Sequence, residues 1–491
     1  MICIPITSSS VEKAIQDIKE SEKSADLIEL RIDYIRDICD KKLGQLLKKT
    51  TKKVIVACRP GFCQGNFKKS ESERISLLKR AVDLKASYID IEFKTDKQEI
   101  LELIENKKNS KIIISYHDFK RTPEIDVLEK KVKDVKRLNP NLIKIVTYAN
   151  SINDNFKIFD LLRKNNDLIS FCMGLYGHMS RVLSKKYGSV LTYSSLSMDK
   201  ESAPGQIPVP ELTKVYNYNL INPDTDVLGV IGSHAENSLS KYLHNANFKK
   251  QNLNFIYVPF KVSENDLCEF MANFRRFGLS GAAVTIPHKI NVMQFLDKTE
   301  KTAKEIAAVN TIVNKNNRLK GYNTDYIGAV TALENKTTLS NKKVLVIGAG
   351  GAARAICFGL KRKKAAIVIA NRTIGKAEKL AEEIDCRSCF LEEMYKEDPD
   401  IIINTTSVGM YPDEDKTVVK KEFLKERVVF DIVYRPMVTR LLKEAKEMGS
   451  EIIKGYEMLL YQGIEQYRLW TGKDPDEELM RKKLKEQLGK K

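Results

Sequence analysis

One stretch, residues 342–373, constrains the fold of this chain more than any other. It holds an apolar run at 344–347, a glycine-rich turn, a helix-forming segment and a second apolar run at 366–370. The turn reads G-x-G-x-x-A, and such a unit lets the backbone approach a pyrophosphate at the helix N-terminus. An ordinary glycine turn is the alternative, but the place between two strands favours a dinucleotide site. The predicted contacts are Gly348, Ala349, Gly350, Gly351 and Ala352.

The end of the second apolar run indicates which dinucleotide binds. A site for NAD usually has Asp or Glu there, which accepts a hydrogen bond from the ribose 2′-hydroxyl. This chain instead continues with Asn371, Arg372 and Thr373, and Lys376 follows. A guanidinium suits a 2′-phosphate, so the sequence favours NADP. A solvated basic loop is the alternative.

The length bounds the architecture, because 491 residues exceed what one hydrophobic core usually holds and predict two or three domains. No apolar run is long enough to cross a membrane. The chain begins with a strand-like run, MICIPITSS, so we expect no signal or transit peptide. Nine cysteines, several inside apolar runs, indicate reduced thiols and a cytoplasmic protein. The C-x-x-C of Cys386 and Cys389 lacks a second pair, so no metal site is expected.

A formal net charge of +18 raises the question of nucleic-acid binding. The lysines, however, are spread among glutamates, and no basic tract is interleaved with aromatic residues. We therefore expect a solvated surface that favours anionic small-molecule substrates, with neither nucleic-acid nor membrane partners. The sequence does not predict an oligomeric state.

Short β-rich runs alternate with polar, lysine-rich segments in the first part of the chain. The runs are ICIPI, ADLIELRID, KKVIVACR, YIDIEF, KIIISYHDF, NLIKIVTYA, LISFCMGLYG and VLTYSS. The segments between them have helical spacing, for example at 127–138 and 154–164. Eight strand–helix units in about 220 residues predict a (β/α)8 barrel. A doubly wound open sheet is the alternative.

Charged side chains lie inside these predicted strands. Glu29 and Arg31 share one strand face by the two-residue period, as do Asp90 and Glu92. Lys144 stands between two isoleucines, and a buried lysine readily becomes an amine nucleophile toward a carbonyl. A half-exposed antiparallel sheet would also alternate in this way. A barrel explains more, because barrel enzymes carry their chemistry at the C-terminal strand ends.

The motifs ELRID, SYHDF, IKI, GLYGHMSR and SAPGQ resemble those of type I 3-dehydroquinate dehydratases, and the resemblance covers residues 1–218. It implies that Lys144 forms an imine with 3-dehydroquinate, that His117 is the general acid/base, and that 3-dehydroshikimate is released. It also implies a substrate site of Glu29, Arg31, Arg59, Arg181, Ser202 and Gln206. One departure is Cys63, which stands where the family has an acid that orients the histidine.

A polar stretch at 217–226 precedes a region with VTIPHK, VNT, NTD, NTTSVGM and a helix containing YQG. Taken singly, Lys289 would be a surface charge and Asp325 a helix N-cap. Together the motifs resemble shikimate dehydrogenases from residue 227 to about residue 473, which implies that Lys289 and Asp325 are the catalytic pair. The implied substrate site contains Ser238, Ser240, Thr285, Asn310, Tyr434 and Gln462, and the implied NADP loop is Asn371, Arg372 and Thr373. Asn237 and Lys241 depart from the family's His and Pro.

The order of the two regions resembles the fused dehydroquinate dehydratase–shikimate dehydrogenases of plants and some bacteria. The resemblance implies a (β/α)8 barrel at 1–218, a substrate-binding domain at 227–335, and a Rossmann-type NADP-binding domain at 336–491 whose C-terminal helices return to the substrate domain. The expected reactions are dehydration of 3-dehydroquinate and reduction of 3-dehydroshikimate to shikimate with NADPH. One alternative is a quinate or shikimate dehydrogenase that works oxidatively. Another is a ligand-sensing regulator that has lost the chemistry.

Overall fold

The computed structural model describes residues 1–489, which divide into two compact units. One unit consists of residues 1–226 and 260–273, and the other of residues 227–259 and 274–489. In the described part of the chain, no helix combines the length and the apolar character needed to cross a lipid bilayer.

Eight parallel strands form the N-terminal barrel, as the sequence predicts. In the sheet, β1 to β7 lie in chain order and β8 lies on the other side of β1. A doubly wound sheet reverses its strand order part-way, so that alternative is wrong. The strands are β1 Ile2–Ile6, β2 Leu27–Arg31, β3 Lys53–Ala57, β4 Tyr88–Glu92, β5 Lys111–His117, β6 Leu142–Tyr148, β7 Leu168–Met173 and β8 Thr192–Ser195, and a short β9, Ile207–Pro208, pairs with β8.

Hydrogen bonds continue around the ring between β7 and β8. The backbone N–H of Val190 donates to Leu168 O at 3.1 Å, and the N–H of Ser170 donates to Ser189 Oγ at 3.2 Å. Ser189 and Val190 lead directly into β8. The sheet therefore closes on itself and places the C-terminal ends of all eight strands at one mouth.

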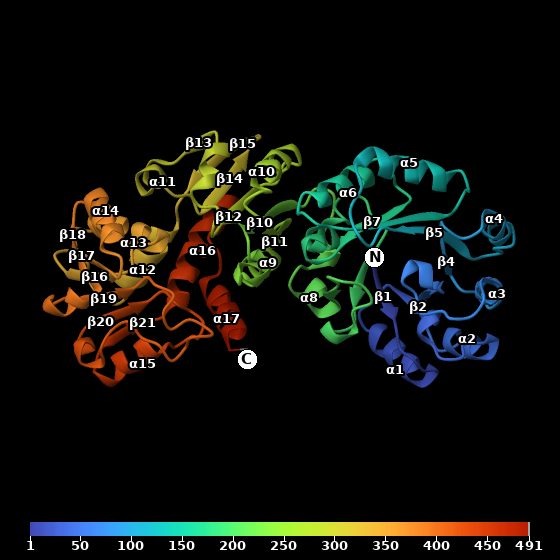
Figure 1. Ribbon diagram of the computed structural model, residues 1–491, viewed down its shortest axis with the longest axis horizontal. Helices are drawn as coiled ribbons and strands as arrows, with labels where there is room; N and C mark the ends of the chain where they lie inside the picture. The colour runs from blue at the N-terminus through green and yellow to red at the C-terminus, as the bar shows by residue number, and fades with distance from the viewer. Residues whose placement is uncertain (490–491) are drawn as a thin grey trace. The chain divides into compact units, whose positions relative to one another are not determined.

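The barrel helices lie around the outside of the strands (Figure 1). In α3, for example, Ile75, Leu78 and Val82 are buried at helical spacing, and Ser70 and Glu73 cap its first turn reciprocally. The helices are α1 Val11–Ser21, α2 Asp40–Leu47, α3 Glu71–Asp83, α4 Lys97–Glu105, α5 Ile125–Lys136, α6 Asp154–Arg163, α7 His178–Leu183 and α8 Val209–Lys214.

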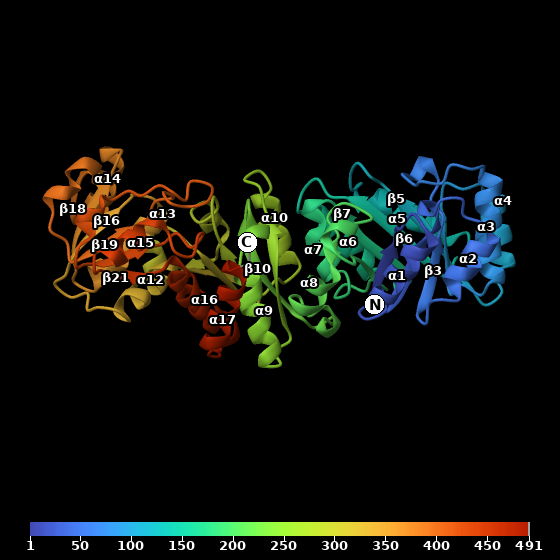
Figure 2. The same cartoon turned by 90° about the horizontal axis from the view of Figure 1, so that it is seen from below.

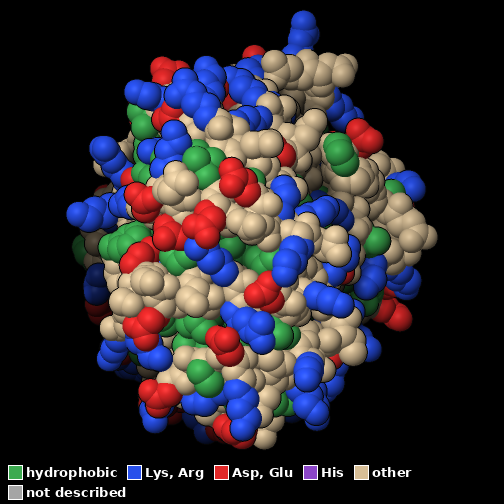
Figure 3. Space-filling view, turned by 90° about the vertical axis from the view of Figure 1, so that its right-hand side faces the viewer, with side chains coloured by type: hydrophobic (Ala, Val, Ile, Leu, Met, Phe, Trp, Pro, Cys, Tyr) green, Lys and Arg blue, Asp and Glu red, His purple; other side chains and the backbone are tan. Residues whose placement is uncertain are grey.

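Basic side chains are distributed over the surface shown in Figure 3, where Lys and Arg are interleaved with Asp and Glu. No single basic stripe runs across this face. On this face the charges are mixed, as on a solvated surface.

A mixed sheet carries the second region of sequence motifs. Its strand order is β11-β10-β12-β14-β15-β13, and β10 and β12 run parallel side by side. The elements are β10 Asp226–Gly232, α9 Ser240–Lys250, β11 Phe255–Lys261, α10 Leu267–Arg276, β12 Gly281–Val284, β13 Lys298–Thr299, α11 Lys301–Ile306, β14 Thr311–Lys315, β15 Arg318–Tyr322 and α12 Asp325–Glu334.

A parallel sheet of order β18-β17-β16-β19-β20-β21 follows. The order reverses between β16 and β19, which is the strand arrangement of dinucleotide-binding Rossmann folds. The elements are β16 Lys343–Ile347, α13 Gly351–Arg362, β17 Ala366–Asn371, α14 Ile374–Ile384, β18 Arg387–Phe390, β19 Ile401–Asn404, β20 Val428–Asp431, α15 Arg440–Glu447 and β21 Glu451–Ile453.

The last two helices, α16 (Gly455–Thr471) and α17 (Glu477–Leu488), return to the mixed sheet and lie beside α9 (Figure 2). Trp470 Nε1 donates to Ile312 O at 2.9 Å. A Cβ at Gly281 would lie 2.6 Å from Trp470 Nε1, so this contact needs glycine in β12. The return places α16 against residues of both the mixed sheet and α12.

Candidate active sites

Residues from separate barrel strands meet in one pocket at the C-terminal strand ends. Glu29 and Arg31 lie in β2, His117 ends β5, and Lys144 lies in β6. The eight residues that the sequence assigns to the dehydratase site all line this pocket: Glu29, Arg31, Arg59, His117, Lys144, Arg181, Ser202 and Gln206.

Lys144 is a buried amine held by two neighbours. Its Nζ lies 3.0 Å from Asp90 Oδ2 and 2.8 Å from Tyr193 OH, and its side chain is 4% exposed. Glu29 Oε1 is 3.8 Å away. The amine therefore points into the pocket from the middle of the barrel, where a carbonyl compound can reach it.

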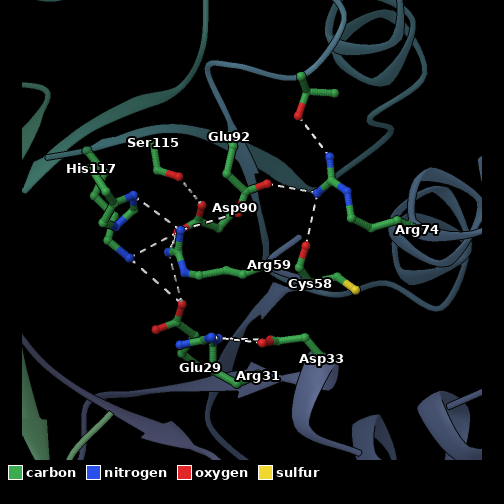
Figure 4. A network of polar contacts seen from close by, with 12 residues as sticks. Glu29, Arg31, Asp33, Cys58, Arg59, Arg74, Asp90, Glu92, Ser115 and His117 are labelled. Atoms are coloured by element: carbon green, nitrogen blue, oxygen red, sulfur yellow. Dashed lines mark hydrogen bonds and ion pairs between the residues drawn. The ribbon is translucent and has the colours of Figure 1, made fainter. Parts of the chain in front are cut away.

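Asp90 and Glu92 connect these groups to Arg59 (Figure 4). Arg59 Nη2 donates to Asp90 Oδ2 and Arg59 Nη1 donates to Glu92 Oε1, both at 3.2 Å. Burial alone would raise the pKa of Asp90, but Lys144, Arg59 and His117 together hold it well below its ordinary value. For Glu92 burial dominates and raises the pKa, although Arg59 and Arg74 oppose the shift.

His117 faces a guanidinium rather than a carboxylate. Its Nδ1 lies 3.3 Å from Arg59 Nη1. Because a guanidinium only donates, Nδ1 must accept, and the neutral ring then carries its proton on Nε2. Burial, with the charges of Arg59 and Lys144, holds the pKa of His117 well below its ordinary value. The ring is therefore neutral at pH 7.

Arg181 is a buried guanidinium with unused donors. It is 1% exposed, and Nη2 donates to Pro204 O at 3.1 Å. Nε and Nη1 have no hydrogen-bond partner among the described residues. Burial lowers the pKa of Arg181 to about 10. Two free donors on a pocket-lining arginine are suited to a substrate carboxylate.

Cys63 lines the same pocket and is 7% exposed. Burial raises the pKa of its thiol to about 11, so it carries no charge at neutral pH. Cys63 therefore supplies no negative charge at the position where an acid was expected. The nearby acids that reach Arg59 are Asp90 and Glu92, both at 3.2 Å.

A second site contains Lys289 and Asp325. Lys289 Nζ lies 2.6 Å from Asp325 Oδ2, and Asn310 Nδ2 donates to Asp325 Oδ1 at 2.8 Å. Asn310 Oδ1 in turn accepts from Thr324 N at 2.7 Å and from Thr311 Oγ1 at 2.8 Å. These contacts fix the Asn310 amide with its NH2 group toward the carboxylate.

The remaining residues of the predicted dehydrogenase site come from several separate elements. Ser238 and Ser240 follow β10, and Thr285 follows β12, so all three lie at the same edge of the mixed sheet. Gln462 lies in α16, which packs closely on α12, since a Cβ at Gly328 would lie 2.9 Å from Gln462 Cβ. Tyr434, which follows β20, packs against the core of the mixed sheet.

The glycine turn leaves space where a pyrophosphate would lie. Gly348 has φ +110°, and a Cβ there would lie 2.5 Å from Thr405 Oγ1, so this position needs glycine. A Cβ at Gly350 or Gly351 would meet nothing within 4 Å. Gly350 precedes α13, and the turn is thus open at a helix N-terminus, as a dinucleotide requires.

The end of β17 and the loop after it contain the three residues expected to bind the 2′-phosphate. Asn371 Nδ2 donates to Thr373 O at 2.8 Å, which holds the turn. Arg372 and Thr373 are exposed. The loop has no acid that would compete with a phosphate, and its guanidinium is accessible.

Three dehydratase contacts are not assigned by the sequence. The two-residue period places Asp90 and Glu92 on the inward face without giving them a role, and no pattern singles out Tyr193. The period of two gives the direction of a side chain. The period does not say which residues of other strands face that side chain. It therefore cannot predict that Arg59 and Lys144 contact Asp90.

Comparisons with known families divide the chain in the same order. Residues 2–223 match the family "Type I 3-dehydroquinase". Residues 230–312 match "Shikimate dehydrogenase substrate binding domain" and residues 331–448 match "Shikimate / quinate 5-dehydrogenase". Residues 455–485 match "Shikimate 5'-dehydrogenase C-terminal domain".

Solved structures resemble the second half of the chain. A shikimate dehydrogenase in complex with NADP+ shares 42% identity with a TM-score of 0.53, over 55% of this chain and 98% of that one. The Thermus thermophilus shikimate 5-dehydrogenase in complex with NADP(H) and shikimate shares 33% identity with a TM-score of 0.50, over 53% and 99%.

Curated relatives include both half-length and full-length proteins. The shikimate dehydrogenase (NADP(+)) of Methanocaldococcus jannaschii is 44% identical over 55% of this chain and its own whole length. The chloroplastic bifunctional 3-dehydroquinate dehydratase/shikimate dehydrogenase of Arabidopsis thaliana is 36% identical over 98% of this chain and 83% of its own. With its barrel and its Rossmann fold in that order, this chain belongs to the family of bifunctional 3-dehydroquinate dehydratase/shikimate dehydrogenases.

Proposed function

We propose that Lys144 and His117 carry out the dehydration in this bifunctional enzyme, and that Lys289 and Asp325 carry out the reduction. The observation that carries the first assignment is the buried amine of Lys144, 3.0 Å from Asp90 Oδ2, in a pocket lined by the other predicted residues. Residues 1–218 hold the dehydratase, 227–335 bind the substrate of the second reaction, and 336–491 bind NADP.

Dehydration uses the amine as a covalent catalyst. Lys144 attacks the ketone of 3-dehydroquinate, and loss of one water gives the imine. The imine acidifies the neighbouring C–H, so that proton leaves and the β-hydroxyl then departs as a second water. Addition of one water to the imine releases 3-dehydroshikimate and frees Lys144. The net change is the loss of one water.

His117 is the proton-transfer group of this sequence. The neutral ring accepts the proton that leaves the C–H and becomes an imidazolium, which then delivers a proton to the departing hydroxyl and returns to the neutral form. Arg181 holds the substrate carboxylate with its free Nε and Nη1. Glu29, Ser202 and Gln206 line the rest of the pocket and orient the ring hydroxyls.

Reduction uses the second site. NADPH supplies the hydride when bound. Lys289 donates a proton to the ketone oxygen of 3-dehydroshikimate as negative charge develops there, and Asp325 holds Lys289 in place. Asn310, Ser238, Ser240, Thr285, Tyr434 and Gln462 position the substrate, and Arg372 binds the 2′-phosphate of the cofactor.

Neither alternative function is favoured. An oxidative NAD enzyme would carry an acid at the end of β17, where this chain has Asn371 and Arg372. A sensor would have no use for a buried amine beside a neutral histidine or for a lysine–aspartate pair. We also place the enzyme in the cytoplasm, because Cys3, Cys58 and Cys172 are buried as free thiols within the barrel.

Two single variants of the full-length chain test the assignment. Lys144→Met should leave 3-dehydroquinate unchanged but still reduce added 3-dehydroshikimate with NADPH. Lys289→Met should convert 3-dehydroquinate to an enone that accumulates, while NADPH is not consumed. Enone absorbance and NADPH absorbance report the two steps separately. Full dehydration by Lys144→Met, or full reduction by Lys289→Met, would refute the corresponding role.

A further inference from the structure

Arg74 is an arginine of α3 that lies outside the pocket and is 0% exposed. All five of its N–H groups have an acceptor. Nε and Nη2 donate to the two oxygens of Glu71 at 2.8 and 2.7 Å, and Nη2 also donates to Thr95 Oγ1 at 2.8 Å. Nη1 donates to Cys58 O at 2.9 Å and to Glu92 Oε2 at 2.8 Å. Its position is therefore fixed from every side.

Arg74 holds Arg59 in two ways (Figure 4). Cys58 O belongs to the peptide that leads into Arg59, so the hydrogen bond from Arg74 fixes the backbone at that point. Glu92 bridges the two guanidinium groups, with Oε2 on Arg74 and Oε1 on Arg59 at 3.2 Å. The direction of the Arg59 side chain thus depends on Arg74.

The guanidinium of Arg59 contacts His117 directly and Lys144 through Asp90, and these are the two groups proposed to act on the substrate. Nη1 lies 3.3 Å from His117 Nδ1, and Nη2 lies 3.2 Å from Asp90 Oδ2, which contacts Lys144 at 3.0 Å. A guanidinium is planar and rigid. A rotation that improved the contact with Glu92 would therefore draw the donors away from His117 and Asp90 together.

We propose that Arg74 is a positioning residue of the dehydratase, acting through Glu92 and Arg59 to hold the ring of His117 in place. The inference rests on the proposed role of His117. Burial raises the pKa of Glu92, and the guanidinium groups of Arg59 and Arg74 oppose this rise. Without Arg74 only Arg59 opposes it, so the Glu92 carboxyl protonates more readily. A protonated Glu92 holds Arg59 less firmly. The Cys58 carbonyl loses a donor in the same change.

The charged groups that face His117 decide the direction of the effect. Arg59 and Lys144 lower the pKa of His117 in addition to burial, Asp90 raises it, and Arg31 lowers it slightly. When Arg59 moves away, the pKa of His117 moves up toward its ordinary value. A residue that only stabilised the barrel would not change this titration.

The test is Arg74→Met in the full-length chain, with the kcat and KM of dehydration measured from pH 5 to 9. We expect kcat to fall about ten- to a hundredfold, KM to change little, and the acid limb of the kcat profile to move to higher pH. Imine trapping at Lys144 with borohydride and 3-dehydroshikimate should persist, which shows that the barrel is folded. Arg80→Met is the matched control, because Arg80 lies on the same helix in surface ion pairs with Asp40 and Asp83, and it should leave the profile unchanged.

An unchanged kcat and profile in Arg74→Met, with only a lower melting temperature, would overturn the inference. If that variant does not fold, Arg74→Lys decides in its place. Lysine keeps the charge but cannot reach Glu71, Cys58 O and Glu92 at once, so the acid limb should shift in the same direction by a smaller amount, and an unshifted limb again rejects the role. Inactivity of Lys144→Met beside a normal Arg74 variant would reject this inference alone and leave the proposed function standing.

Discussion

Asp325 receives Lys289 Nζ on one carboxylate oxygen at 2.6 Å and Asn310 Nδ2 on the other at 2.8 Å. Both oxygens are therefore engaged, and the side chain of Lys289 is aimed by a carboxylate that cannot turn. Lys289 follows β12 and Asp325 begins α12, so two separate elements must keep their places for this contact to form. The pair is thus a sensitive point for testing the reductive half of the enzyme.

Replacing Asp325 with Asn keeps the shape of the side chain and removes its charge. Lys289 then loses its ion pair, and the Asn310 NH2 group meets a weaker acceptor. We expect turnover in the reduction of 3-dehydroshikimate to fall by about a hundredfold or more, while NADPH binding stays normal. Dehydration by the same chain is the internal control. A change confined to KM would assign Asp325 to binding rather than to proton transfer.

Borohydride should reveal the imine on the barrel lysine. Reduction of the imine formed with 3-dehydroshikimate fixes the ligand to Lys144, and the added mass should appear on the peptide that contains it. Dehydration should be lost while reduction of fresh 3-dehydroshikimate continues. Lys186, which is a lysine of the same barrel outside the pocket, should stay unlabelled. Full dehydratase activity without labelling at Lys144 would contradict covalent catalysis.

The depressed pKa of His117 predicts a dehydratase that tolerates mild acid. The ring stays neutral as pH falls through about 6.5, the ordinary pKa of histidine, so the acid limb of kcat/KM should lie below that value. The chain has five histidines, and selective ¹³C labelling should show that His117 does not titrate in this range. An acid limb at the ordinary pKa of histidine would contradict the burial and charge argument.

The same shift has a consequence for stability. Below about pH 6.5 the unfolded chain binds a proton at this histidine and the folded chain does not, so the unfolded state holds more protons. The free energy of unfolding should therefore decrease as the pH falls below that value. His117→Asn should show a smaller decrease over that interval in denaturant titrations of the barrel. An equal decrease in both proteins would assign the effect to other groups.

Arg372→Ala tests the cofactor assignment. If Arg372 binds the 2′-phosphate, its loss should weaken NADPH by about 1.5–3 kcal/mol, or about ten- to a hundredfold in KM, and leave NADH almost unchanged. Arg387→Ala is a suitable control, because Arg387 is an exposed arginine on β18, paired with Glu397 at 2.6 Å. Equal effects on both cofactors would reject Arg372 as the discriminating residue.

The barrel is predictable because each strand carries its own local signal. Eight β-rich runs separated by helical segments indicate the strand order, and the period of two places Glu29, Asp90 and Lys144 inside. The contacts among them are not predictable. Tyr193 in β8 meets Lys144 in β6, and this pairing follows from closure of the ring, which no single run encodes.

Arg74 illustrates the limit most clearly. In the sequence it stands in a polar helix rich in Lys, Arg and Glu, where an arginine is usually solvated. It is buried because Glu92 at the end of β4, Thr95 in the loop after β4 and Cys58 O directly after β3 surround it. A helix pattern describes one element, whereas the burial of a charge depends on the acceptors that other elements supply.

Gln466 is a buried amide one turn beyond Gln462 on α16, and it directs the hydrogen bonds behind Asn310. Its Nε2 donates to Thr311 Oγ1 at 3.0 Å and to Asn310 O at 3.3 Å. The Thr311 hydroxyl directs its own proton to Asn310 Oδ1, which is its shorter contact at 2.8 Å, whereas Thr324 Oγ1 lies 3.4 Å away. That proton helps to keep the Asn310 NH2 group on Asp325. The amide of Gln466 therefore sets the direction of a hydrogen-bond chain that ends at Asp325 and Lys289, the proposed catalytic pair.

Two substitutions at Gln466 distinguish an effect on the direction of these hydrogen bonds from an effect on packing. Gln466→Glu has the same shape, but its carboxylate draws the Thr311 proton toward itself, and Asn310 Oδ1 loses a donor. Gln466→Met removes the donor yet leaves the Thr311 hydroxyl free to keep bonding to Asn310. We therefore expect reduction to slow by about tenfold or more in the Glu variant, because a buried hydrogen bond is lost beside a charge, and by less in the Met variant.

Thr311→Ser should stay close to wild type, since it keeps the hydroxyl. Steady-state reduction of 3-dehydroshikimate measures all three, and a Met variant slower than the Glu variant would show that Gln466 acts by packing alone.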